Sequence, residues 1–153
     1  MSKKTDEASI ERMYNLLCDI AKQRFMDEPR LFDNNRLLVE GYVSASPFNV
    51  HFRFIVQRSL AMISIFSILP YEAESEKITE VAMRLNDINY CDLTNGSYSM
   101  DKENGRIIFS CPLLFRGSLL SRELIEETMA YITETIAGYN TELFELSGGK
   151  MSE

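Results

Sequence analysis

The residues of this chain best suited to catalysis or metal binding are one histidine, three cysteines and several glutamates. His51 is the only histidine, and a nucleophilic mechanism would need it beside a serine or cysteine as a general base. It stands instead inside an alternating strand pattern, so we interpret it as a side chain that is hydrogen-bonded or faces solvent. Zinc binding would require a CxxC motif or a second histidine, and the sequence contains neither. We therefore predict a protein that is not an enzyme, with no catalytic, cofactor-binding or metal-binding residues.

The three cysteines, Cys18, Cys91 and Cys111, are odd in number, far apart and set within apolar patterns. This usage predicts buried, reduced thiols in a reducing compartment. The first seven residues are polar, and no apolar signal-peptide region follows them. These two observations together predict a cytoplasmic protein.

The remaining polar candidates have structural interpretations. Glu123, Glu126, Glu127 and Glu134 fall mostly off the apolar stripe of the last predicted helix, which favours a solvated face over paired acid–base catalysis. Asn86 and Asn89 lie near the end of the middle helix. We expect them to end that helix and bond to the following turn, the alternative being a polar pocket.

A unit from Ser75 to Tyr139 organises the chain. Two strands, Ser97–Asp101 and Arg106–Cys111, form a hairpin whose Asn104-Gly105 turn requires positive φ. An apolar stripe of helical spacing lies on each side of the hairpin, and Ser121 is the predicted cap of the second helix. The first stripe is Ile78, Val81, Ala82, Leu85 and Ile88, and the second is Leu124, Ile125, Thr128, Met129, Ile132, Ile136 and Tyr139.

A helix from Ile10 and three strands precede this unit. The first strand is Leu37–Val43, and the second alternates, with Val50, Phe52, Phe54 and Val56 on one side. The third strand, Leu60–Leu69, ends at Pro70 and is apolar on both sides, which indicates an interface or a strand covered on both faces. The candidate interface residues are His51, Arg53, Ile55, Gln57, Met62, Ser64 and Phe66.

The predicted fold class is α+β, with the order α-β-β-β-α-β-β-α. Five antiparallel strands carry helices mainly on one face, in one sheet or in two abutting sheets. We expect a single domain over residues 1–146 and a flexible tail over residues 147–153. A net charge of -7 and a pI near 4.8 argue against nucleic acid and anionic membranes as partners.

Four short motifs resemble the YbjN-like family, described as putative bacterial sensory transduction regulators. They are Leu85-Asn86 in the middle helix, Gly96-Ser97-Tyr98 at a strand start, an acidic-x-x-x-Gly turn at Asp101–Gly105, and Leu120-Ser121 before the last helix. The resemblance covers about Arg36 to Tyr139. It implies a fold similar to that of type III secretion chaperones, which are small, acidic, usually dimeric proteins that hold partner polypeptides. It implies no catalytic residue.

The leading hypothesis is a non-enzymatic, YbjN-type protein-binding or regulatory domain that forms a homodimer and binds a protein partner or client polypeptide. The homodimer would use the strands Asn49–Gln57 and Leu60–Leu69, and an interface of this kind buries roughly 800 Å² per partner. One alternative is a dedicated secretion-chaperone-like holder of a single client. Another is a small-molecule sensor or enzyme with a pocket between helices and sheet.

Overall fold

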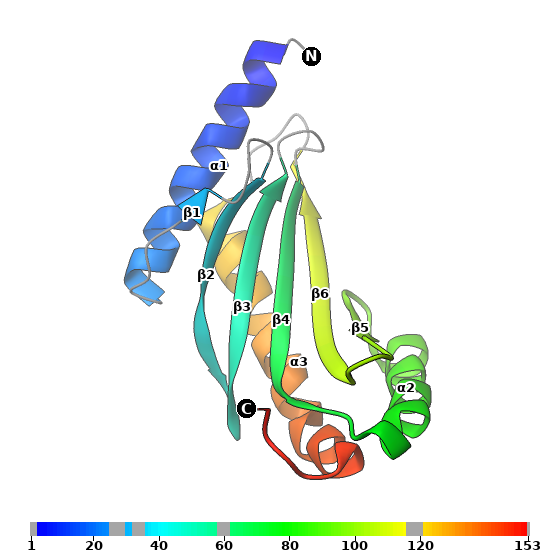
Figure 1. Ribbon diagram of the computed structural model, residues 1–153. Helices are drawn as coiled ribbons and strands as arrows, with labels where there is room; N and C mark the ends of the chain where they lie inside the picture. The colour runs from blue at the N-terminus through cyan, green and yellow to red at the C-terminus, as the bar shows by residue number, and fades with distance from the viewer. Residues whose placement is uncertain (1–2, 25–29, 32–35, 58–61, 116–120, 153) are drawn as a thin grey trace.

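The computed structural model describes residues 3–24, 30–31, 36–57, 62–115 and 121–152 (Figure 1). The start of the predicted third strand, at Leu60, lies outside these residues. The elements in chain order are α1 (Lys3–Arg24), β1 (Arg30–Leu31), β2 (Arg36–Ala45), β3 (Phe48–Gln57), β4 (Met62–Glu72), the 3-10 turn η1 (Ser75–Lys77), α2 (Ile78–Asp87), the π-helical turn η2 (Ile88–Asp92), β5 (Ser97–Met100), β6 (Arg106–Leu114) and α3 (Arg122–Ser147).

All strands belong to one antiparallel sheet in the order β1-β2-β3-β4-β6-β5. β2, β3 and β4 form the predicted meander, and β6 pairs with β4 so that the hairpin extends the same sheet. β1 adds only two residues, paired with Leu37 and Leu38. The predicted α+β class and five-stranded antiparallel sheet are therefore confirmed, with β1 as a short addition at the edge.

The helices gather on one face of the sheet. Figure 1 shows α3 running behind the strands, α1 crossing beside β2, and α2 lying beyond β5. The side chains of Val50, Phe52, Phe54 and Val56 point to this face and are almost fully buried. Burying an apolar side chain of this size stabilises the fold by about 1.5–3 kcal/mol. The opposite face, called the open face below, has no helix over it among the described residues.

α3 begins at the predicted cap, because the backbone N–H of Leu124 donates to Ser121 Oγ at 3.1 Å. The buried residues of α3 recur every three or four positions, as the apolar stripe predicts. Asn140 is a polar member of this stripe and is fully buried. Its side chain accepts from Tyr71 OH at 3.0 Å and donates to Ala45 O at 2.6 Å. One amide thus ties α3 to the ends of β2 and β4.

Two strands continue past a proline. β4 passes Pro70 and reaches Glu72, with a register shift between Ile68 and Glu72 where the ladder to β6 is irregular. β6 passes Pro112 to Leu114, while β5 pairs only with residues 107–110. Proline lacks the N–H that a ladder needs, but it is tolerated at irregularities and edges. The prediction that Pro70 stops the third strand is therefore wrong.

α2 is attached to α3 by a two-pronged ion pair. Arg84 Nε donates to Glu142 Oε2 at 2.5 Å, and a second guanidinium nitrogen donates to Oε1 at 2.9 Å. This contact holds the pKa of Glu142 below its usual range. Both side chains are substantially exposed, so the contribution to stability is small.

The described residues of the predicted C-terminal tail lie against the end of β4. Ser147 is buried, its carbonyl accepts from the backbone N–H of Glu74 at 2.9 Å, and the N–H of Ser152 donates to Pro70 O at 2.8 Å. The single domain and the flexibility of residues 147–153 stay predictions. Among the helices that the structure describes, none is both long enough and apolar enough to cross a membrane.

Candidate functional site

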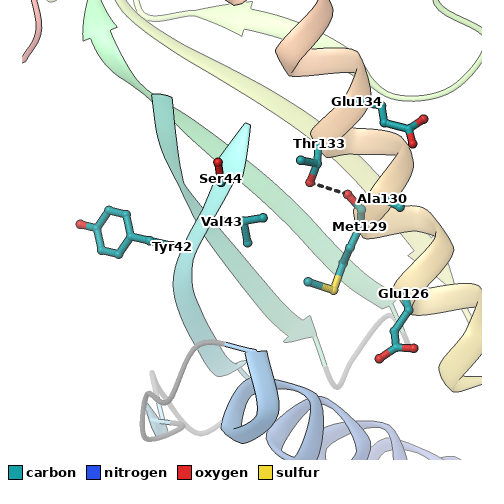
Figure 2. A pocket seen from close by; sticks show the side chains of 8 residues that line it. All are labelled: Tyr42, Val43, Ser44, Glu126, Met129, Ala130, Thr133 and Glu134. Atoms are coloured by element: carbon teal, nitrogen blue, oxygen red, sulfur yellow. Dashed lines mark hydrogen bonds between the residues drawn. The ribbon is translucent and has the colours of Figure 1, made fainter. Parts of the chain in front are cut away.

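A groove lies between the outer edge of β2 and α3 (Figure 2). We call it the β2 groove; its volume is about 420 Å³. Figure 2 shows Val43 pointing toward Met129, whereas Tyr42 points away from α3. The lining residues are Tyr42, Val43, Ser44, Glu126, Met129, Ala130, Thr133 and Glu134. The groove thus has an apolar floor and a carboxylate toward each end.

The strand that borders this groove has an unpaired edge. β2 pairs with β3 along its whole length, from Arg36 to Ala45. On its other side, β1 pairs with Leu37 and Leu38 alone, and no strand among the described residues continues along residues 39–45. In an antiparallel ladder, alternate residues direct their N–H and C=O groups away from the partner strand. Residues 39–44 therefore have backbone donors and acceptors that no neighbouring described strand pairs, and residues 42–44 among them line the groove.

The charge of the groove is negative. Glu126 and Glu134 are eight residues apart on α3, which is about 12 Å along a helix axis. Glu126 is also paired with Arg122, whose Nε lies 3.4 Å from Glu126 Oε1. Arg122 therefore offsets part of the charge at the Glu126 end, while the chain as a whole carries a net charge of -7. Basic groups would be attracted to both ends of the groove.

The seven candidate interface residues lie together on the open face, on β3 and β4. His51, Arg53, Ile55, Gln57, Met62 and Phe66 are half-buried, whereas Ser64 is buried and accepts a hydrogen bond from Gln57 Nε2 at 3.1 Å. Ile68 and Ile108 continue the apolar part across β4 and β6. The structure brings these residues together; their role as an interface stays a prediction.

Two carboxylates on the open face are paired with basic side chains. Glu40 Oε2 lies 3.1 Å from His51 Nε2 and 3.2 Å from Arg53 Nε. The His51 ring stacks on Tyr42, with a centroid separation of 4.9 Å. At one end of the face, an Arg106 guanidinium nitrogen lies 3.9 Å from Glu72 Oε1. The interpretation of His51 as a satisfied side chain is confirmed, and Glu40 and Glu72 on this face each have an arginine partner.

The cysteines do not form a reactive group. Cys111 is buried and Cys18 half-buried, and burial raises the pKa of both thiols, which disfavours the nucleophilic thiolate. Cys91 is exposed, so the prediction of three buried thiols is wrong for this residue. It lies in the π-helical turn Ile88–Asp92, where Ile88 is the buried side chain. Within the described part of the chain, no three His, Cys, Asp or Glu residues are grouped to hold a metal ion.

Asn89 has the structural role that we expected. Its side-chain amide donates to Tyr98 O at 2.9 Å, and its oxygen accepts from the backbone N–H of Tyr98 at 2.8 Å. The side chain therefore pairs with β5 as a neighbouring strand would, and it positions the hairpin after α2.

The sequence suggested a pocket between helices and sheet only as an alternative, and it did not place one at the edge of β2. Glu126 and Glu134 were expected only on a solvated face, and Met129 only in the core. One signal was present: the first strand of a meander lies at a sheet edge unless another strand returns to cover it. The position of α3 beside that edge depends on contacts between residues more than 80 positions apart.

The helices of the described residues and the antiparallel sheet define an α+β protein with the type III secretion chaperone-like fold. A solved chain with this fold occurs in "Crystal Structure of the ExsC-ExsE Complex". The two chains align with a TM-score of 0.55 and 13% sequence identity, over 84% of this chain and 92% of that chain. At this identity the similarity establishes the fold alone. No family model matches the sequence, and no curated protein matches it; membership of the YbjN-like family stays a prediction.

Proposed function

We propose that this chain is a non-enzymatic, chaperone-like protein that binds an extended segment of a client polypeptide at the β2 groove. The observation that carries the proposal is the edge of β2 at residues 39–44, which no described strand pairs and of which residues 42–44 line a groove of about 420 Å³. A client strand added to β2 would satisfy the outward backbone groups and place alternate side chains in the groove. The similarity to a chain of a protein–protein complex supports this class of function.

The groove also suggests the chemistry of the client. Residues i and i+4 of a strand are about 13 Å apart, close to the axial separation of Glu126 and Glu134 on α3. A client with Lys or Arg at these two positions would place a basic group near each carboxylate. The residue at i+2 would then face Val43 and Met129 and should be apolar. We therefore propose a basic-x-apolar-x-basic motif.

The finer assignment that we favour is a cytoplasmic regulator of YbjN type that acts as a homodimer through the open face. Four strands of about ten residues form a surface of roughly 20 by 33 Å, near the roughly 800 Å² per partner of a stable interface. The ion pairs of Glu40 and Glu72 neutralise these carboxylates within the face, so they would repel the carboxylates of a second copy only weakly. Half-buried Met62 and Phe66 would become covered.

A substitution in the groove tests client binding. Ala130→Arg places a long side chain in the groove from an exposed position on α3, and Ala82→Arg makes the same change on the exposed surface of α2. The probe is a fluorescent peptide that carries Lys-Thr-Val-Thr-Lys. We expect Ala130→Arg to weaken its binding about tenfold, or ~1.4 kcal/mol, and Ala82→Arg to leave it unchanged.

The measurement is fluorescence anisotropy, with a scrambled peptide of the same composition as the second control. In the scrambled peptide one lysine moves by a single position and so faces the other side of the strand. Equal affinity of the wild type and Ala130→Arg would contradict the proposal, as would equal affinity for the two peptides. Failure of the wild type to bind either peptide would count against it as well.

A further inference from the structure

The segment after α3 folds back onto the sheet. We call residues 148–152 the C-terminal strap. Gly148 and Gly149 have φ values of 118° and 70°, a left-handed conformation that reverses the chain at the helix end. Met151 then forms an antiparallel bridge with Tyr71, and the Ser152 N–H donates to Pro70 O at 2.8 Å. Figure 1 shows the chain end beside the lower ends of β3 and β4.

Backbone hydrogen bonds and exposed side chains hold the strap to the rest of the molecule. Lys150 Nζ lies 3.3 Å from Glu74 Oε1, but the Lys150 side chain is 80% exposed, and an exposed ion pair contributes little. Met151 is 50% exposed. The preceding Ser147 is buried and bonded to Glu74 through its carbonyl. The strap can therefore open locally while α3 stays in place.

The strap and the open face share a hollow. Its volume is about 440 Å³, and Met151 and Ser152 line it together with His51, Arg53 and Ile68. The β3–β4 ladder ends at the His51–Ile68 pair, and the strap pairs with β4 just beyond it, at Pro70 and Tyr71. The strap thus lies beside the end of β4 and forms one side of the hollow at the end of the surface that would meet a second copy.

We propose that the C-terminal strap is an intramolecular cover that competes with a second copy of this chain for one end of the open face. This inference rests on the proposed homodimer and does not involve the β2 groove. While the strap is closed, a second copy must displace Met151 and Ser152 before it reaches His51 and Arg53. Opening the strap removes that cost, so self-association becomes tighter.

Two variants open the strap by different means. A stop codon at Lys150 ends the chain after both glycines, and Lys150→Glu replaces the attraction to Glu74 by repulsion. Lys102→Glu, in the exposed hairpin turn, makes the same charge change elsewhere. Sedimentation velocity over a concentration series gives the dimer dissociation constant. We expect both strap variants to lower it about fivefold or more, and Lys102→Glu to leave it at the wild-type value.

Hydrogen exchange at the Ser152 amide of Lys150→Glu verifies that the strap is open. A dissociation constant that is unchanged or raised in both strap variants would overturn the inference and leave the homodimer standing. If all four proteins remain monomers at high micromolar concentration, the homodimer is wrong and the strap has no such role. Client binding at the β2 groove, measured by the peptide assay, is unaffected by either result.

Discussion

Replacing Asn140 by aspartate should lower the free energy of unfolding by about 3–5 kcal/mol at pH 7. The fully buried amide donates to Ala45 O at 2.6 Å and accepts from Tyr71 OH at 3.0 Å. A carboxylate keeps the bond from Tyr71 but has no hydrogen for the Ala45 carbonyl. It would instead place a negative charge against that oxygen in a buried site.

The effect of Asn140→Asp should also depend on pH. Burial beside a carbonyl raises the pKa of the new carboxyl group above its unfolded value of about 4. The folded state then binds a proton more tightly than the unfolded state. The loss in free energy of unfolding is therefore smallest below pH 4 and grows as the pH rises. Urea unfolding at several pH values measures this. Asn86→Asp, at an exposed position on α2, should change stability by about 0.5 kcal/mol or less. A loss below 1 kcal/mol for Asn140→Asp at pH 7 would contradict the role given to this amide.

Replacing Gly105 by alanine should destabilise the protein by about 3 kcal/mol or more. Gly105 has a φ of +76°, and a Cβ there would lie 2.2 Å from Ala73 O and 2.9 Å from Ala73 N. These are backbone atoms, and Ala73 N–H already donates to Gly105 O at 2.9 Å. The turn cannot move away without breaking the contact between the hairpin and the end of β4. The strain of a left-handed alanine and its steric overlap with Ala73 therefore both destabilise the folded state.

The same substitution at Gly138 should stabilise the protein instead. Gly138 lies within α3, and a Cβ there would meet no atom within 4 Å. Alanine has the higher helix propensity, so Gly138→Ala should stabilise the protein by about 1 kcal/mol. Denaturant unfolding of both variants, with equal m-values, gives the comparison. A neutral or stabilising Gly105→Ala would show that the hairpin does not pack on β4 as described.

Local patterns were sufficient to predict much of the fold. The alternation in β3 predicted which side chains are buried, because side chains on a strand point to opposite faces in turn. Asn104-Gly105 predicted the hairpin turn, and Ser121 predicted the cap of α3. Each of these features depends on neighbours within a few residues. The helical stripes likewise predicted a sheet covered mainly on one face.

Features that depend on distant contacts were not predicted. β4 extends through Pro70 because its ladder to β6 is irregular there and because the N–H of Ser152, some 80 residues later, donates to the Pro70 carbonyl. The sequence pattern did not indicate that Asn140 is buried. A buried amide is acceptable only when hydrogen-bond partners satisfy it, and here those partners are distant in the sequence. The β2 groove needs both the edge of β2 and the position of α3. Sequence patterns describe each element, but they do not place one element beside the other.

The central claim is that a client adds a strand to the free edge of β2. The most direct measurement is amide hydrogen exchange of residues 39–45, with and without the peptide that carries Lys-Thr-Val-Thr-Lys. Alternate amides of this segment face outward in an antiparallel ladder, and we predict that bound peptide slows their exchange while the remaining amides, already paired with β3, do not change. Peptide binding that leaves every amide of residues 39–45 at its original rate would contradict the account.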